Sequence, residues 1–187
     1  MKPNDSLAEM LLELQALDRV PRMGYVLRGV TEPESVAEHT FHVALLVWAM
    51  AEQLPEVDTK RALELALLHD LAEVRTGDLP MTAGRYWPEG AKKVAEAAAN
   101  RELLAPLGER ADQLTREMAE RRSAESRLVK ACDKVQLLLK VSAYEHWGAG
   151  GLAEFWANEE NFPSSGFEPV DRLVAELREL RDRLHLD

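Results

Sequence analysis

The sequence predicts an all-α protein that folds as a single helical bundle. Apolar residues recur at intervals of three and four along most of the chain, which is the periodicity of one helix face. The breaks between these runs carry Pro, Gly or residues that cap helices. The 187 residues contain no repeat, no low-complexity tract and no linker long enough to divide them. We therefore expect one domain over residues 1–187.

Composition and charge narrow the class of protein. Hydrophobic residues make up 46% of the chain, yet no apolar run approaches the roughly 20 residues of a membrane span. The first residues lack the apolar segment of a signal peptide, so we expect a soluble, cytoplasmic protein without a membrane partner. A net charge of −10 argues against a nucleic-acid partner. A small phosphorylated substrate fits if local cations and a metal offset the global charge.

The first predicted helix begins at Asp5 or Ser6, where Glu9 can complete a capping box with Ser6, and it ends near Asp18. Its apolar face is formed by Leu7, Met10, Leu11, Leu14 and Leu17. An irregular segment with Pro, Gly and three arginines follows over residues 19–29. It is either a solvated loop or a phosphate-binding loop.

Two further helices carry the histidines. Ser35 and Glu38 form a capping box that opens a helix running to about Leu54, with His39 in its first turn and His42 three residues later. Asp58 or Thr59 caps the next helix, which we expect to continue through His69 and Asp70 to about Thr76. Gly77 suits the end of that helix.

The second half of the chain is also predicted to be helical. A loop with aromatic residues over 81–90, which could border a pocket or a partner, precedes helices over 91–105 and about 109–121. Ser123 caps a long helix over 124–147, glycines at 148–151 break it, and a short helix and an aromatic loop lead to a terminal helix over 169–184. The buried face of the long helix is predicted to comprise Leu128, Val129, Ala131, Cys132, Val135, Leu138, Leu139 and Ser142.

His69 and Asp70 lie inside a run of Ala, Leu and Val, where ionisable groups are costly unless they are paired or bind a metal. Neighbouring residues on a helix point about 100° apart, so both can reach one point beside it. A metal ion there would satisfy the imidazole and the carboxylate together. On a continuous helix Glu73 would lie one turn on from His69, where it could hold a water. With Cys132 as the single cysteine, any metal must use His and carboxylate ligands.

Each remaining candidate has an ordinary structural explanation when taken alone. His39 could be a core histidine, and Asp133 could form an ion pair with Lys130 or Lys134 on its own helix. Asp78, directly after Gly77, could be a turn aspartate. His39, His69-Asp70 and Asp133 occur in this order, each on a predicted apolar helix, and the set is a more specific sign of a metal site than any one of these residues.

This order resembles the H…HD…D signature of the HD-domain superfamily of metal-dependent phosphohydrolases. The surrounding stretches resemble its 5′-deoxynucleotidase branch, typified by YfbR-like and HD-domain-containing-protein-2-like proteins. The resemblance runs from about residue 7 to the Tyr144-Glu145 region and more loosely to the C-terminus. The matching stretches are Arg19-Val20-Pro21-Arg22, Glu34-Ser35-Val36-Ala37-Glu38-His39, His69-Asp70-Leu71-Ala72-Glu73, Gly77-Asp78-Leu79-Pro80 and Val129-Lys130-Ala131-Cys132-Asp133-Lys134.

The resemblance implies a helical bundle with one divalent metal ion held by His39, His69, Asp70 and Asp133. It places this metal-site core at about residues 35–147, with the C-terminal helices at 151–187 packed on it. Two imidazoles and two carboxylates neutralise a divalent ion and leave positions for water and a phosphate oxygen. Such ligands suit Mn²⁺, Co²⁺, Mg²⁺, Fe²⁺ or Zn²⁺, and the sequence does not choose among them.

The implied activity is hydrolysis of nucleoside 5′-monophosphates, with a 5′-deoxynucleotidase favoured. Asp70 and Glu73 are the implied catalytic residues, and Glu73 would position the water or take its proton. Arg19 matches the family's phosphate-contacting arginine, and Asp78 matches its aspartate that contacts the sugar 3′-hydroxyl. Val20 departs from the tryptophan of the best-known bacterial form and leaves more room beside the sugar. This departure bears on the expected preference for deoxyribose over ribose and leaves the expected phosphatase activity unaffected.

Two other functions compete with this interpretation. The chain could be an HD hydrolase of another phosphorylated metabolite, or a non-catalytic module that senses a nucleotide. We also expect a homodimer, both from the family and from aromatic content that could be exposed or could cover the bundle core. These aromatic residues are Trp147, Phe155, Trp156, Phe162 and Phe167.

Overall fold

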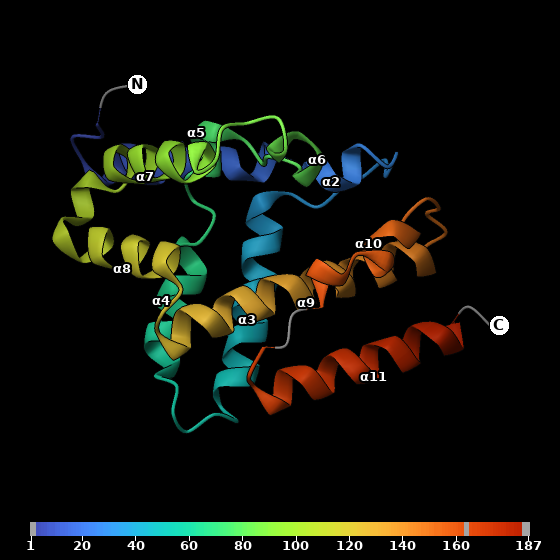
Figure 1. Cartoon of the computed structure of the whole chain (residues 1–187). Helices are drawn as coiled ribbons and strands as arrows, with labels where there is room; N and C mark the ends of the chain where they lie inside the picture. Colours follow the sequence, from blue (N-terminus) through green and yellow to red (C-terminus); the bar gives the residue numbers. More distant parts are fainter. Residues whose placement is uncertain (1–2, 163–164, 185–187) are drawn as a thin grey trace.

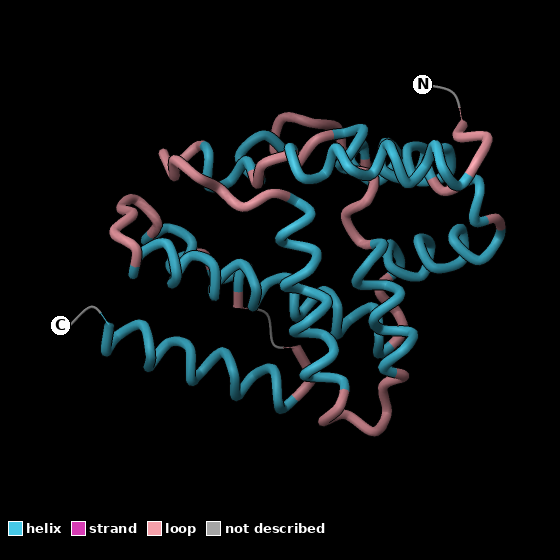
Figure 2. The backbone as a smooth tube through the Cα atoms, turned by 180° about the vertical axis from the view of Figure 1, so that it is seen from behind, coloured by secondary structure: helices cyan, strands magenta, loops and turns pink. Residues whose placement is uncertain are grey.

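The protein is described by a computed structural model that covers residues 3–162 and 165–184. Every regular element in these ranges is helical (Figure 1 and Figure 2), which confirms the predicted all-α class. The elements are α1 (Leu7–Leu14), η1 (Gln15–Arg19), α2 (Met23–Val26), α3 (Val36–Ala51), α4 (Thr59–Leu68), α5 (Glu73–Thr76), α6 (Met81–Gly84), α7 (Ala91–Leu103), η2 (Ala105–Leu107), α8 (Glu109–Glu120), α9 (Ala124–His146), α10 (Ala153–Ala157), η3 (Glu159–Asn161) and α11 (Glu168–Leu184).

Helices α3, α4 and α9 pack against one another at the centre of the bundle, and α11 lies alongside α9 (Figure 1). Their shared core includes Val43, Leu65, Leu128 and Val129, which are fully buried, and Val170 of α11 joins it. Burying one such side chain contributes about 1.5–3 kcal/mol relative to leaving it exposed. This apolar packing holds the three central helices at fixed positions relative to one another.

Two smaller contacts attach the N-terminal segment to this centre. Arg75 of α5 donates to Glu13 at 2.7 Å and to Glu102 at 2.9 Å, which ties α5 to α1 and α7. Arg22 N–H donates to Glu34 O at 2.9 Å, and Val36 N–H donates to Val20 O at 2.8 Å. These two backbone hydrogen bonds form a short antiparallel bridge between Pro21 and Ser35, which fixes the segment before α2 against the start of α3.

The predicted helix starts are confirmed at three caps. Ser35 and Glu38 form the complete capping box of α3, Asp58 accepts from Arg61 N–H at the start of α4, and Ser123 accepts from Ser126 N–H at the start of α9. The capping box at α1 is incomplete. Ser6 accepts from Glu9 N–H, but the Glu9 carboxylate accepts from Asp5 N–H instead of Ser6 N–H.

The predicted continuous helix from residue 59 to 76 is wrong. Helix α4 ends at Leu68, residues 69–72 form turns, and α5 begins at Glu73. Leu71 N–H donates to Leu68 O and Glu73 N–H donates to Asp70 O, so bonds to the third residue back replace the α-helical pattern. His69 and Asp70 therefore lie in a turn, and Glu73 does not follow His69 by one α-helical turn.

Further corrections concern side chains that the sequence placed wrongly. Leu139 is 37% exposed and Ser142 is half-buried, so neither belongs to the buried face of α9. Residue 139 follows buried Leu138 and points about 100° away from it around the helix. Residues 81–90 are not entirely loop, because they contain the short helix α6.

The aromatic residues of the C-terminal region mostly cover the core. Phe167 is buried, Phe155 packs against Tyr25 with ring centroids 5.6 Å apart, and only Trp147 of the five is exposed. Of the two alternatives that the sequence left open, exposure therefore applies to Trp147, and the other four aromatic residues are buried or half-buried. Within residues 3–162 and 165–184, every helix is too short or too polar to cross a membrane.

Candidate metal centre

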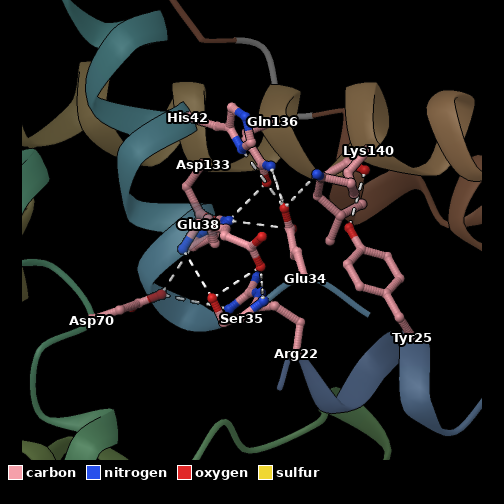
Figure 3. Close-up of polar contacts among 12 residues, drawn as sticks. Arg22, Tyr25, Glu34, Ser35, Glu38, His42, Asp70, Asp133, Gln136 and Lys140 are labelled. Atoms are coloured by element: carbon pink, nitrogen blue, oxygen red, sulfur yellow. Dashed lines mark hydrogen bonds and ion pairs between the residues drawn. The ribbon is translucent and has the colours of Figure 1, made fainter. Parts of the chain in front are cut away.

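Four predicted metal-site residues converge from three elements at the centre of the bundle. His39 comes from the first turn of α3, His69 and Asp70 from the turn after α4, and Asp133 from α9. His39 Nε2 lies 3.4 Å from His69 Nε2, 3.6 Å from Asp70 Oδ2 and 3.3 Å from Asp133 Oδ1. Figure 3 shows Asp70 and Asp133 reaching this point from separate parts of the chain.

The donor atoms of His39, His69 and Asp70 all lie within 4.8 Å of one another, as a shared metal ion requires. Each histidine has its other ring nitrogen on a protein oxygen: His39 Nδ1 is 2.7 Å from Gln136 Oε1, and His69 Nδ1 is 2.7 Å from Ala66 O. Both Nε2 atoms therefore face the point on which the four side chains converge. The residues present fit a divalent ion with nitrogen and oxygen ligands.

The electrostatics of this cluster favour positive charge. Burial opposes a charged His69, but the carboxylates of Asp70 and Asp133 outweigh it and raise the pKa of His69 to about 9. Burial likewise opposes an ionised Asp70, but His69 and Arg22 hold the pKa of Asp70 below its usual range. The pKa of Asp133 is also lowered, since Lys130, 2.6 Å away, and His39 outweigh the effect of burial. The predicted pairing of Asp133 with Lys130 is thus present together with the convergence on His39.

Glu73 is the most unusual carboxyl of the region. It begins α5, is 1% exposed, and its Oε2 has no hydrogen-bond partner among the described residues. Its Oε1 lies 3.5 Å from Lys92 Nζ. Burial, with the negative charges of Asp70 and Asp78, raises the pKa of Glu73 to about 9. A carboxyl of this kind can hold a proton at neutral pH and has one oxygen free to transfer it.

Arg22 is a residue of the site to which the sequence analysis assigned no role. Its Nη1 lies 3.0 Å from Asp78 Oδ1 and 3.5 Å from Asp70 Oδ2. The other oxygen of Asp78 accepts from Met23 N–H at 2.6 Å. Asp78 is therefore a bridge between the segment before α2 and the centre, more than the isolated turn aspartate that the sequence also allowed. The Arg-Val-Pro-Arg stretch was the signal that could have identified Arg22.

Arg19 lies outside this network. It ends η1, which packs against α3 and α5, and its side chain is exposed without an ion pair to any described residue. His42 is 43% exposed at its side chain, and its Nδ1 lies 3.9 Å from Glu34 Oε2. It is therefore not one of the converging residues. Gln136 and Glu34 lie on the Nδ1 side of His39, at 2.7 Å and 3.8 Å, whereas Asp70 faces its Nε2.

The comparisons with known proteins agree with this fold. The profile of the HD domain matches residues 14–168, so the chain belongs to the HD domain family. Among curated relatives, the 5′-deoxynucleotidase HDDC2 of Homo sapiens is 32% identical over 179 residues, which cover 92% of this chain and 84% of that protein. The predicted superfamily and its 5′-deoxynucleotidase branch are confirmed by these matches.

Solved structures show the same architecture. A conserved hypothetical protein from Pyrococcus furiosus is 33% identical, has a TM-score of 0.75, and is matched over 99% of its length by 96% of this chain. The HD phosphohydrolase of cyanophage S-2L, solved with dA and one catalytic Zn²⁺ ion, is 22% identical with a TM-score of 0.60. That match covers 98% of this chain and 99% of the phage protein, and at this identity it shows the shared fold alone.

Proposed function

We propose that this protein is a metal-dependent phosphomonoesterase that hydrolyses nucleoside 5′-monophosphates to nucleoside and phosphate, acting as a 5′-deoxynucleotidase. The observation that carries the proposal is the convergence of His39, His69 and Asp70 within 4.8 Å, beside Asp133 and the buried Glu73. The curated human relative, named a 5′-deoxynucleotidase, supports the same reaction class.

His39, His69, Asp70 and Asp133 would hold one divalent ion of the Mn, Co, Mg, Fe or Zn type. When bound, the ion supplies a Lewis acid that polarises a phosphate oxygen and lowers the pKa of a bound water. The apolar helices α3, α4 and α9 hold the ligands in place, so little rearrangement is needed when metal binds.

Glu73 would act as the general acid–base group, with Asp70 beside it as a ligand. A general base must lie within hydrogen-bond reach of the proton it accepts, and Glu73 Oε2 has no protein partner that competes for that role among the described residues. Lys92, 3.5 Å from the other oxygen, stabilises the ionised form of Glu73 after it has given up a proton.

Arg19 and Asp78 would bind the substrate. Arg19 is the exposed arginine of this segment without a protein partner in the described structure, and its planar guanidinium suits phosphate oxygens. Asp78 already accepts from Arg22 and from Met23 N–H, but each carboxylate oxygen has a second lone pair. One of these lone pairs would accept from the sugar 3′-hydroxyl.

The test is phosphate release from all deoxyribonucleoside and ribonucleoside 5′-monophosphates by metal-stripped protein resupplied with Mn²⁺, Co²⁺, Mg²⁺ or Zn²⁺. We expect metal-dependent release that is fastest in the deoxy series. The variant His69→Gln should lose this activity, whereas His146→Gln, which changes an exposed histidine on α9, should retain it. Equal release from both series would show a broader nucleotidase. No release with any metal would refute the proposed reaction.

We further propose that the chain forms a homodimer. The support comes from α3, where Phe41, Leu45 and Trp48 follow one another on one helix face and are each about half exposed or more. A particle mass near the 21.0 kDa of one chain in light scattering at micromolar concentration would contradict a homodimer.

The single domain over residues 1–187, with a metal-site core at about 35–147, stays a prediction, and the packing of α11 on α9 supports it. For the C-terminal helices predicted at 151–187, residues 163–164 and 185–187 lie outside the described residues. Three further expectations also stay predictions: a cytoplasmic location, a small-molecule rather than nucleic-acid partner, and residues 81–90 as the border of a pocket or a partner.

A further inference from the structure

We propose that Gln136 and Glu34 are positioning residues that set the tautomer and the orientation of His39 for metal binding, with Lys140 holding Glu34 in place. The inference rests on the proposed function, since it concerns how one ligand of that metal site is prepared. The contacts that carry it run through the bundle behind His39 and are drawn in Figure 3.

One face of α9 carries both a ligand and its support. Asp133, Gln136, Lys140 and Tyr144 follow at spacings of three, four and four residues, which places them along a single stripe of the helix. Gln136 is 3% exposed, and the side chain of Lys140 is 16% exposed. The stripe faces the N-terminus of α3, where His39 and Glu34 lie. A change in the position of α9 would therefore move Asp133 and the support of His39 together.

Lys140 stands at one end of this chain of contacts and determines which group donates and which accepts at each step. Lys140 Nζ, which can only donate, lies 3.2 Å from Glu34 Oε2. The Glu34 carboxylate accepts from Gln136 Nε2 at 3.0 Å and 3.3 Å. The amide NH₂ of Gln136 must then point to Glu34, because the opposite orientation would place two acceptor oxygens together.

This orientation of the amide dictates the proton on His39. Gln136 Oε1 is left 2.7 Å from His39 Nδ1, and an amide oxygen can only accept, so His39 donates from Nδ1. In the neutral ring the lone pair is then on Nε2, which faces His69, Asp70 and Asp133. The opposite tautomer would direct an N–H at the metal position and could donate to Asp133 Oδ1 at 3.3 Å.

Glu34 is built to stay in this position. Its side chain is 1% exposed, and burying a carboxylate is costly unless it is paired and hydrogen-bonded. Its backbone is held at both ends, because Glu34 N–H donates to Tyr144 Oη at 2.7 Å and Glu34 O accepts from Arg22 N–H. The same residue therefore connects the support of His39 to the segment that brings Arg22 to Asp70.

The decisive experiment changes Gln136 without touching a proposed ligand. The variant Gln136→Met keeps a side chain of similar length and removes both amide groups. In metal-free protein, ¹⁵N NMR of the histidine rings should show His39 as the Nδ1–H tautomer in the wild type and a shift toward Nε2–H in the variant. Zn²⁺ affinity, measured by competition with a chelator, should fall by about 10–100-fold, the usual effect of losing a residue that orients a ligand.

Two further variants separate positioning from general stability. Glu34→Gln keeps the volume but can both donate and accept, so the Gln136 amide loses its fixed orientation and His39 should show both tautomers even if Gln136→Met does not fold. Gln113→Met, at an exposed glutamine of α8, should leave the tautomer and the Zn²⁺ affinity as in the wild type.

An unchanged Nδ1–H tautomer in folded Gln136→Met or Glu34→Gln would overturn the inference, even if both variants unfold at lower temperature. If the wild type neither binds a divalent metal nor releases phosphate, the proposed function fails. The tautomer measurement on metal-free protein still decides the role of Gln136 in that case.

Discussion

Replacing Glu73 by the isosteric glutamine should stabilise the metal-free protein while it strongly reduces catalysis. The folded carboxyl is 1% exposed and its pKa is raised to about 9, whereas an unfolded glutamate titrates near 4.5. At pH 7 folding must therefore protonate Glu73. The interval from 4.5 to 7, at about 1.4 kcal/mol per pH unit, corresponds to about 3.5 kcal/mol of lost stability.

The pH dependence of the stability gained by Glu73→Gln is a second check. Below pH 4.5 the carboxyl is protonated in both states, so Glu73→Gln should have little effect there. The gain should grow as the pH rises and level off near pH 9, where the folded wild type also ionises. Urea unfolding of metal-free protein at pH 4.5, 7 and 9 measures this directly. Activity should fall by about 10²–10⁴-fold, the usual contribution of a general acid–base group, at unchanged metal content.

Glu13→Gln is the matched control with the opposite sign. Glu13 accepts from Arg75 and its pKa is lowered, first by that hydrogen bond, so its contribution is present above the unfolded pKa and is lost as the pH falls. Glu13→Gln should therefore destabilise the protein at pH 7 and less so at low pH. A Glu73→Gln variant that is less stable than wild type at pH 7, or equally altered at pH 4.5 and 7, would refute the reasoning. Retained activity would refute the catalytic role.

Three further outcomes are expected. Metal binding below about pH 9 should release a proton from His69, so affinity should rise with pH and the binding enthalpy should depend on the buffer in calorimetry; an enthalpy independent of buffer would contradict this. Arg19→Ala should raise KM without changing the urea midpoint, whereas Arg22→Ala should cost about 1–3 kcal/mol in urea unfolding because it removes the cation that pairs with the half-buried carboxylates of Asp70 and Asp78. A lower urea midpoint for Arg19→Ala than for Arg22→Ala would show that Arg19, and not Arg22, stabilises the fold. Val20→Trp should raise the ratio of deoxy to ribo turnover in the phosphate assay, and a lower ratio would place the sugar elsewhere.

Local sequence signals predicted most of the helices because they act within a few residues. Ser35, Asp58 and Ser123 cap their helices through contacts three residues away, so no knowledge of the fold was required. The convergence of His39, His69, Asp70 and Asp133 followed from family order. Its physical cause, the packing of α3, α4 and α9, depends on long-range contacts.

The features that the sequence missed depend on partners far along the chain. Local propensity favours a continuous helix through residues 66–74, yet the chain turns after Leu68, where His69 Nδ1 contacts Ala66 O. Gln136 lies in the apolar helix α9, and the spacing of apolar residues in that helix does not indicate that this polar side chain is buried. Glu34 belongs to a matching stretch, but the sequence assigns it no role, because its contact with Gln136 joins residues 102 positions apart.

The most direct measurement is anomalous scattering from crystals of the wild-type protein supplied with Co²⁺ or Zn²⁺. We expect one strong peak at the centre of the bundle, about 2.0–2.2 Å from Nε2 of His39, Nε2 of His69 and carboxylate oxygens of Asp70 and Asp133. The same peak should be absent from Asp133→Asn crystals or much reduced. A peak bound by other residues, or no peak in wild-type crystals at saturating metal, would contradict the assignment of this cluster as the metal site.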